Sequence, residues 1–133
     1  MKKIEHIGIA VNSLEDASIL YEKLLGVSAY KQEEVISERV NTAFFKTGIN
    51  KIELLEAIDK ESPIAKFIAR RGEGIHHIAF EVEDIIFEMD RLKNEGFFVL
   101  SDFPKKGADN KWVVFLHPKS VNGILIELCQ EII

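Results

Sequence analysis

Hydrophobic and polar positions along the first sixty residues predict a strand, a helix and three more strands. Apolar residues fill a strand at about 3–11, and from Ser13 to Leu25 they recur at the spacing of one helix face. Ser13 is a typical helix N-cap, and Gly26 is typical of a helix end because glycine readily adopts the left-handed conformation. The predicted apolar face of this helix consists of Leu14, Ala17, Leu20, Tyr21, Leu24 and Leu25. Three strands are expected to follow, at about 28–34, 39–46 and 51–56.

The same pattern occurs a second time. The segment His6–Val11 is matched by His77–Val82, which begins 71 residues later, and polar residues and a helical pattern follow each segment. Each half ends with an apolar strand that carries one acid, Glu53 in the first half and Glu127 in the second, 74 residues apart. In the second half a helix is expected at about 84–94, with strands near 75–82, 97–100, 111–117 and 123–130.

This duplication predicts the α+β class, with two paired β-α-β-β-β modules whose curled, mixed sheets surround a common cleft. A chain of 133 residues has the length of one ordinary domain. We therefore expect a single domain over residues 1–133, with module one at about 1–60, a linker helix at about 62–70 and module two at about 74–133. Ser62 and Pro63 are typical of the N-cap and first position of that linker helix.

Composition and charge exclude several classes of function. Hydrophobic residues make up 47% and charged residues 29%, which is typical of a folded globular domain and unlike a disordered or membrane protein. The net charge of −5 and the absence of a basic run argue against a nucleic-acid partner. Cys129 is the single cysteine and lies in an apolar run, so we expect a buried, reduced thiol. We expect neither a signal peptide nor a membrane span, and therefore a cytoplasmic protein.

Four polar side chains occupy positions where strands are otherwise apolar. His6 and His77 lie near the start of equivalent strands, and Glu53 and Glu127 lie in the middle of equivalent strands. If the two modules pack with approximate two-fold symmetry, equivalent positions converge from both sides and the four side chains meet. Two imidazoles and two carboxylates suit divalent metals such as Co, Ni, Mn, Fe or Zn, and differ from the thiolate sets of structural zinc. The sequence therefore predicts a metal site formed by these four residues.

Structural explanations of these residues stay open. A single histidine on a strand is commonly a core or surface residue, and Glu53 and Glu127 fit the alternation of strands that expose one face to water. His76 competes with His77 as a ligand. The repeat favours His77, because it aligns with His6 without a gap and a slip of one residue turns a side chain to the opposite face.

With these features, the chain resembles the vicinal oxygen chelate superfamily of glyoxalases, bleomycin resistance proteins and dioxygenases. Within it, the sequence is most similar to the methylmalonyl-CoA epimerase family. The resemblance covers nearly the whole chain, in the segments His6–Val11, Lys51–Glu56, Ser62–Phe67, Gly72–Phe80, Phe115–Lys119 and Gly123–Gln130. The last three of these segments are similar to the epimerases in particular.

The resemblance implies an isomerase that epimerises methylmalonyl-CoA at C2 in propionate metabolism, acting on a small CoA thioester. It implies a divalent metal, Co²⁺ first, with Ni²⁺, Mn²⁺ or Zn²⁺ as alternatives. The family's ligand positions match His6, His77 and Glu127, and its fourth ligand, usually Gln or Glu, falls on Glu53. Family members are commonly homodimers, so the same is expected here. Glu127 matches the residue that is both a metal ligand and an acid/base in the family.

A second acid/base is required for inversion, and here the sequence departs from the family. The epimerases generally carry an acid just before a Gln-Gly-Val triplet, whereas this chain has Glu38 and Arg39 in place of the Gln-Gly pair. We take Glu38 as the second acid/base, with Glu34 in reserve and solvated charge as the structural alternative. The lysines of the segment 104–111 are candidates for contacting CoA phosphates, although a charged hairpin loop has the same composition.

Other functions on the same scaffold remain as alternatives. Lactoylglutathione lyase (glyoxalase I) uses the same kind of ligand set and enolate chemistry, so the ligands do not separate it from an epimerase. An extradiol dioxygenase needs two histidines, one carboxylate and open positions, and the fourth donor Glu53 argues against it. A metal-free protein that sequesters a ligand is the alternative from outside the enzymes, and it has no need of four metal donors.

Overall fold

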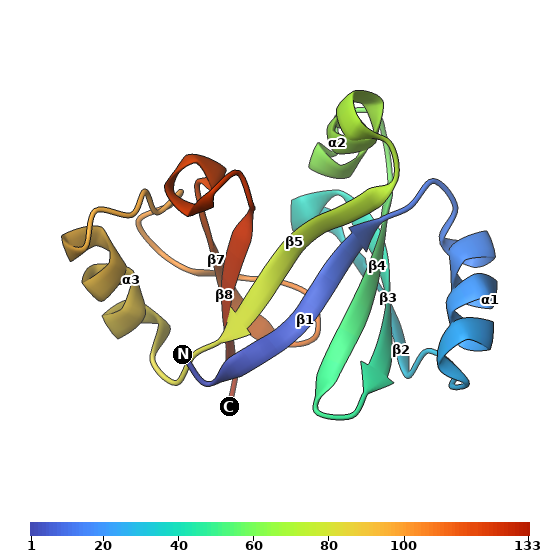
Figure 1. Ribbon diagram of the computed structural model, residues 1–133, viewed down its shortest axis with the longest axis horizontal. Coiled ribbons are helices and arrows are strands. Elements are labelled where there is room, and N and C mark those ends of the chain that lie inside the picture. Colours follow the sequence, from blue (N-terminus) through green and yellow to red (C-terminus); the bar gives the residue numbers. More distant parts are fainter. The chain divides into compact units, whose positions relative to one another are not determined.

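The computed structural model describes residues 1–133. The chain divides into two units. The N-terminal unit comprises His6–His76, and the C-terminal unit comprises Met1–Glu5 together with His77–Ile133. Strand β1 (Lys3–Ala10) therefore begins in the C-terminal unit and continues into the N-terminal unit. Each half of the chain has the predicted order β-α-β-β-β, and the α+β class is confirmed (Figure 1).

The N-terminal unit contains a mixed sheet covered on one face by helix α1. After β1 come α1 (Leu14–Leu25), β2 (Lys31–Val35), the short 3₁₀ helix η1 (Ile36–Glu38), β3 (Val40–Thr47) and β4 (Asn50–Ala57). The strands are ordered β2-β3-β4-β1, with β1 parallel to β4 and the other neighbours antiparallel. The core between α1 and the sheet contains Val11, Ala43, Phe45 and Leu54.

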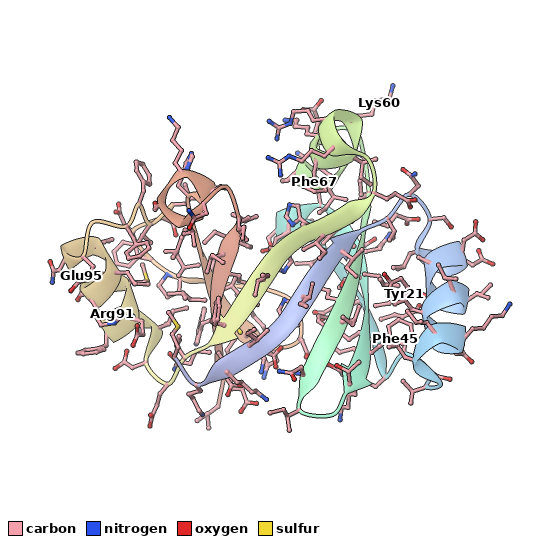
Figure 2. All side chains as sticks on the ribbon, viewed as in Figure 1. Tyr21, Phe45, Lys60, Phe67, Arg91 and Glu95 are labelled. Carbon is pink, nitrogen blue, oxygen red and sulfur yellow. The ribbon has the colours of Figure 1, made fainter.

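Helix α1 begins and ends where the sequence predicts. The hydroxyl of Ser13 accepts a hydrogen bond from the backbone N–H of Asp16, and Gly26 ends the helix with a φ of 72°. Figure 2 shows Tyr21 of α1 beside Phe45 of β3, with ring centroids 6.4 Å apart. The predicted apolar face is correct in part: Leu14, Ala17, Tyr21 and Leu25 pack on the core, whereas Leu20 and Leu24 are 61% and 69% exposed. The apolar face of α1 is wider than the surface that contacts the sheet, so Leu20 and Leu24 at its edge stay exposed.

The C-terminal unit repeats the arrangement. It contains β5 (Gly74–Glu81), whose first residues belong to the N-terminal unit, α3 (Ile85–Asn94), β6 (Lys105–Lys106), β7 (Lys111–Leu116), the short 3₁₀ helix η2 (Pro118–Val121) and β8 (Ile126–Glu131). The strands are ordered β5-β8-β7-β6, and β5 is parallel to β8. Helix α3 packs Ile85, Met89 and Leu92 against Val114 and Leu128 of this sheet.

The strand predicted at 97–100 is wrong. This segment makes one bridge to the sheet, between Val99 and Leu116, and the strand that pairs with the edge of β7 is instead Lys105–Lys106. Alternation alone suggested a strand, since Val99 packs on the core while Phe98 is exposed. The pairing ends early because the chain turns away through 101–104, where Pro104 has no N–H to donate to a neighbouring strand.

Helix α2 (Pro63–Arg71) follows β4 in the N-terminal unit. The hydroxyl of Ser62 accepts a hydrogen bond from the N–H of Ile64, and Pro63 occupies the first turn, which confirms the predicted start. None of the helices combines the length and the apolar character needed to cross a membrane.

Candidate metal centre

A buried histidine and a buried glutamate contact each other in the N-terminal unit. His6 lies on β1 and Glu53 on the parallel strand β4, where Gly8 is the residue paired with Glu53. His6 is therefore two residues from that pairing position, and its side chain is on the same face of the sheet as that of Glu53. The Nε2 atom of His6 lies 3.3 Å from Oε1 of Glu53. This face is the one opposite α1, because the neighbouring Leu54 packs in the core under the helix.

Two residues of β3 complete this pair. The hydroxyl of Thr42, which is fully buried, donates a hydrogen bond of 2.9 Å to Oε2 of Glu53. Phe44 is paired with Glu53 across the strands, and its ring meets the ring of His6 edge-on with a centroid distance of 6.1 Å. The hydrogen bond and the ring contact together restrict both side chains of the pair.

The C-terminal unit contains an equivalent pair. Glu127 of β8 is paired with Ala79 of the parallel strand β5, and His77 lies two residues before Ala79. The Nε2 atom of His77 lies 3.5 Å from Oε1 of Glu127. Phe115 of β7 is paired with Glu127 and meets the His77 ring edge-on, again with a centroid distance of 6.1 Å. The two units thus repeat the same three side chains in the same strand register.

The two phenylalanines were not singled out by the sequence analysis. Phe44 and Phe115 are 71 residues apart, which is the offset between His6 and His77. Extending the repeat to apolar positions is the sequence signal that identifies them. Such a signal is weak by itself, because the chain has nine phenylalanines in varied surroundings, from buried to exposed.

Burial rules out the interpretation of these glutamates as outward-facing strand residues. Glu53 is 4% exposed and Glu127 is 6% exposed, and the histidines beside them are 5% and 3% exposed. A carboxylate is costly to bury unless it has a hydrogen-bonding or charged partner, or binds a metal. A strand residue that faces solvent would be open to water, whereas each unit has a buried carboxylate in contact with a buried imidazole.

The donor set fits a divalent cation. His6, His77 and Glu127 are buried, and each offers a ligand atom of a kind that holds a metal ion. In tetrahedral zinc sites the imidazole nitrogens and carboxylate oxygens lie about 2.0–2.2 Å from the metal, so two of them on one ion are about 3.3–3.6 Å apart. The separations of 3.3 and 3.5 Å within the two pairs match that spacing, and they are long for a charge-assisted hydrogen bond.

The other two histidines have different surroundings. His76 is half-buried, and its ring contacts the ring of Phe67 of α2 at a centroid distance of 5.0 Å. His117 caps the start of η2, where its Nδ1 atom accepts a hydrogen bond of 3.0 Å from the N–H of Lys119. The neighbour of Glu127 is thus His77, the histidine that the repeat favours.

Cys129 is free and buried, as the sequence analysis expected. It lies two residues after Glu127 on β8, and its Sγ atom is 3.6 Å from the carbonyl oxygen of Phe80. Burial raises the pKa of the Cys129 thiol well above its ordinary value, and the negative charge of Glu127 raises it further. The thiol is therefore protonated at neutral pH and is no candidate for a nucleophile.

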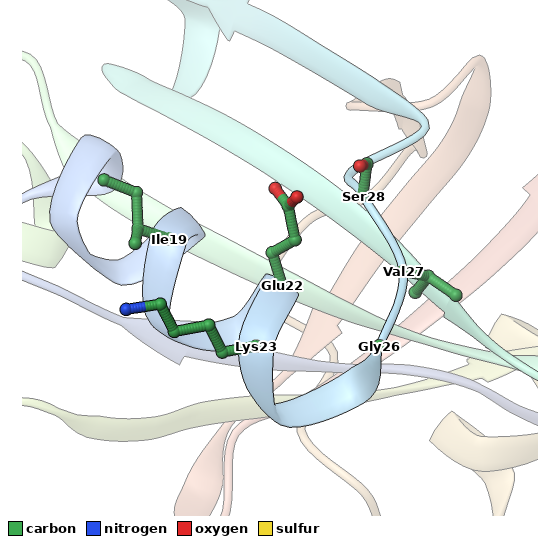
Figure 3. A pocket seen from close by; sticks show the side chains of 6 residues that line it. All are labelled: Ile19, Glu22, Lys23, Gly26, Val27 and Ser28. Atoms are coloured by element: carbon green, nitrogen blue, oxygen red, sulfur yellow. The ribbon is translucent and has the colours of Figure 1, made fainter.

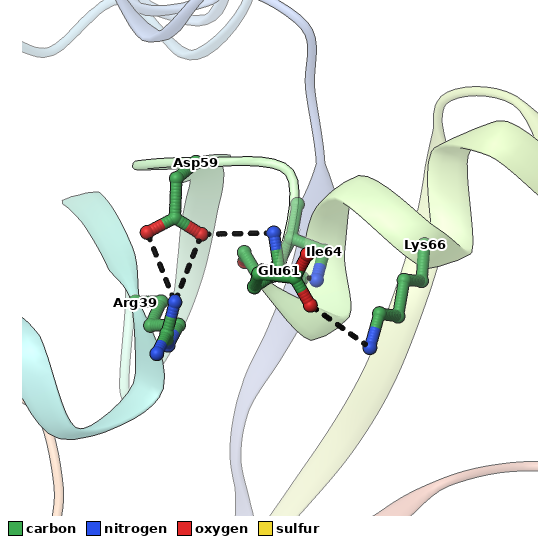
Figure 4. A network of polar contacts seen from close by, with 6 residues as sticks. Arg39, Asp59, Glu61, Ile64 and Lys66 are labelled. Atoms are coloured by element: carbon green, nitrogen blue, oxygen red, sulfur yellow. Dashed lines mark hydrogen bonds and ion pairs between the residues drawn. The ribbon is translucent and has the colours of Figure 1, made fainter.

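Glu38, the expected second acid/base, lies at the end of η1 and is half-buried. The residue after it, Arg39, has a φ of 57°, a left-handed conformation that favours glycine. Two contacts hold Arg39 in place. Its Nη1 atom donates to both carboxylate oxygens of Asp59, at 3.3 and 3.1 Å (Figure 4). Its carbonyl accepts a hydrogen bond from the N–H of Ile58. The turn that carries Glu38 is therefore tied to the segment that follows β4.

The segment expected to contact CoA forms a hairpin. Lys105 pairs with Val113 and Lys106 with Trp112, and the N–H of Gly107 donates to the carbonyl of Lys111. Lys105 and Lys106 are exposed, whereas the ammonium group of Lys111 is buried and lies 3.4 Å from a carboxylate oxygen of Glu131. Two of the three lysines are thus exposed to solvent.

A hollow at the end of α1 is a different kind of site. Figure 3 shows it between the last turns of α1 and the loop that follows, and its volume is about 500 Å³. It contains no histidine and no pair of carboxylates, so it offers no metal site. The residues that line it are Ile19, Glu22, Lys23, Gly26, Val27 and Ser28.

Known proteins similar to this chain include both uncharacterized proteins and epimerases. The uncharacterized protein YqjC of Bacillus subtilis is 39% identical over 98% of this chain and 93% of its own length. The ethylmalonyl-CoA/methylmalonyl-CoA epimerase of Cereibacter sphaeroides is 44% identical over 96% of this chain and 97% of its own length. Both similarities run over nearly the full length of the two proteins compared.

A solved structure and a family model agree with these similarities. A variant of Streptomyces coelicolor methylmalonyl-CoA epimerase in complex with 2-nitronate-propionyl-CoA is 32% identical, with a TM-score of 0.96 over 100% of this chain and 99% of that chain. The model of the Glyoxalase/Bleomycin resistance protein/Dioxygenase superfamily matches residues 5–115. From its fold, its paired His–Glu contacts and these similarities, this chain belongs to the glyoxalase/bleomycin resistance protein/dioxygenase superfamily.

Proposed function

We propose that this protein is a metal-dependent epimerase that inverts C2 of methylmalonyl-CoA. The observation that carries the proposal is the repeated buried His–Glu contact, with ligand-atom separations of 3.3 and 3.5 Å. The full-length relationship to an ethylmalonyl-CoA/methylmalonyl-CoA epimerase supports the choice of substrate. A solved relative bound to an analogue of a propionyl-CoA thioester supports the substrate class.

The residues proposed to hold the metal are His6, Glu53, His77 and Glu127, with one pair from each unit. Two nitrogens and two oxygens suit Co²⁺, and also Ni²⁺, Mn²⁺ and Zn²⁺. When bound, the cation supplies a Lewis acid that stabilises negative charge developing on the thioester oxygen. The phenylalanine beside each histidine contacts the imidazole edge-on and restricts the orientation of the ring.

Proton transfer is assigned to Glu127 and Glu38. The C2 hydrogen of the substrate lies between a thioester and a carboxylate, so its removal leaves charge delocalised onto the thioester oxygen. Inversion requires that one group removes the proton from one face and another group returns a proton to the opposite face. Glu127 is proposed to act on one face, and Glu38, on the turn before β3, on the other. Arg39 and Asp59 limit the movement of that turn.

The experiment that tests this proposal follows the two epimers separately. Each pure epimer of methylmalonyl-CoA is incubated with Co²⁺-loaded protein, and both the formation of the other epimer and the exchange of the C2 hydrogen with solvent are measured. The wild-type protein is expected to invert both epimers. Glu38→Gln is expected to slow proton exchange from one epimer by about 10²-fold or more, because a neutral amide removes no proton. Exchange from the other epimer and the bound Co²⁺ should change little.

Glu34→Gln is the matched control, because Glu34 lies on β2 in the same hairpin and is exposed. We expect the Glu34→Gln variant to exchange the C2 hydrogen of both epimers, and to invert both epimers, at the wild-type rate. A selective loss in Glu34→Gln would transfer the role of second acid/base to Glu34. Wild-type exchange in both variants would contradict the assignment of this role to the hairpin altogether.

A further inference from the structure

Glu53 makes a second polar contact besides the one with His6. One carboxylate oxygen of Glu53 lies 3.3 Å from His6, and the other accepts the hydrogen bond of 2.9 Å from the hydroxyl of Thr42. Both oxygens of Glu53 are thus assigned to particular neighbours. Thr42 is fully buried, so water does not compete for this hydrogen bond.

In the C-terminal unit the position of Thr42 is taken by Val113. Thr42 is paired with Leu55 across β3 and β4, two residues from the Phe44–Glu53 pair. Val113 is paired with Cys129 across β7 and β8, two residues from the Phe115–Glu127 pair. Valine has no hydroxyl, so this position gives Glu127 no such hydrogen bond. The two halves therefore differ at the position of Thr42, whose side chain donates to Glu53.

A buried hydrogen bond of this kind has a definite chemical effect. Donation from a hydroxyl to one carboxylate oxygen fixes the orientation of the group. Partners of this type, one shell away from a metal, hold the ligand in position, and losing one typically lowers metal affinity by about 10–100-fold. A carboxylate held in this way keeps its other oxygen on the side of His6, in the position needed to bind a cation.

We infer that Thr42 is a positioning residue that holds the carboxylate of Glu53 in the orientation of a metal ligand. This inference rests on the proposed function, because Glu53 is one of the residues proposed there to hold the metal. The positioning group is a single hydroxyl on β3.

The inference is tested by measuring Co²⁺ affinity of the metal-stripped full-length protein by calorimetric titration. Thr42→Val removes the hydroxyl at nearly constant size, and we expect Co²⁺ to bind about 10-fold or more weakly. Thr42→Ser keeps the hydroxyl and is expected to bind Co²⁺ within about three-fold of the wild-type affinity. Wild-type affinity in Thr42→Val, or an equal loss in both variants, would overturn the role of Thr42.

If the wild-type protein does not act on methylmalonyl-CoA, the proposed function fails, and the Co²⁺ titrations still decide whether Thr42 positions Glu53.

Discussion

Glu127→Gln is expected to abolish turnover of methylmalonyl-CoA, with a loss of kcat of about 10³-fold or more. The substitution removes a negative charge from the proposed metal site and also removes one of the two acid/base groups, each of which typically contributes about 10²–10⁴-fold. The side chain keeps its size and one oxygen, so the buried position between Phe115 and His77 is preserved. The measurement is the steady-state rate at saturating Co²⁺ and substrate.

The matched control for this variant is Glu95→Gln. Glu95 follows α3 and is exposed, so its neutralisation changes the net charge equally without touching the paired residues. We expect the control to retain the wild-type rate. A Glu127→Gln variant with near wild-type turnover would remove Glu127 from the mechanism and leave the site without its assigned base.

Substitution of His77 is expected to remove bound metal, whereas substitution of His76 is not. His77→Gln takes away an imidazole that lies 3.5 Å from Glu127, and loss of a direct ligand should exceed the roughly 10–100-fold effect of losing a more distant partner. His76→Gln removes a ring that packs on Phe67 and leaves the His77–Glu127 pair in place. Elemental analysis after gel filtration of Co²⁺-loaded protein measures the occupancy of each variant.

His76→Gln is itself the control, because it replaces the adjacent residue on the same strand with the same side chain. Greater metal loss in His76→Gln than in His77→Gln would mean that the repeat is aligned one residue out of register. That result would also place the histidine ligand of the C-terminal half on the other face of β5.

The duplication made much of the fold predictable from the sequence. Helix ends depend on local interactions, so Ser13, Gly26 and Ser62 identified the ends of α1 and the start of α2 correctly. The order β-α-β-β-β followed from hydrophobic periodicity and was confirmed in both halves. The segment 97–100 failed because a strand is defined by its partner, and alternation does not reveal that the chain leaves the sheet after one bridge.

The residues of the candidate site were also predicted only in part. The repeat identified His6, Glu53, His77 and Glu127, and the structure brings each histidine into contact with the glutamate of its own unit. Thr42 was not predictable, because it has no counterpart in the second half and its hydrogen bond depends on the register of β3 with β4. The homodimer, the preferred metal and the contacts to CoA stay predictions.

The central claim is that the protein forms an enolate at C2 of methylmalonyl-CoA and needs a metal to do so. Incorporation of deuterium at C2 in heavy water, followed by mass spectrometry, tests it most directly, with Co²⁺-loaded protein compared with metal-stripped protein. We predict rapid exchange with the loaded protein and restoration of exchange when Co²⁺ is returned to the stripped protein. Absence of exchange with Co²⁺ bound in stoichiometric amount would contradict the claim, and would direct attention to the glutathione hemithioacetal as the substrate.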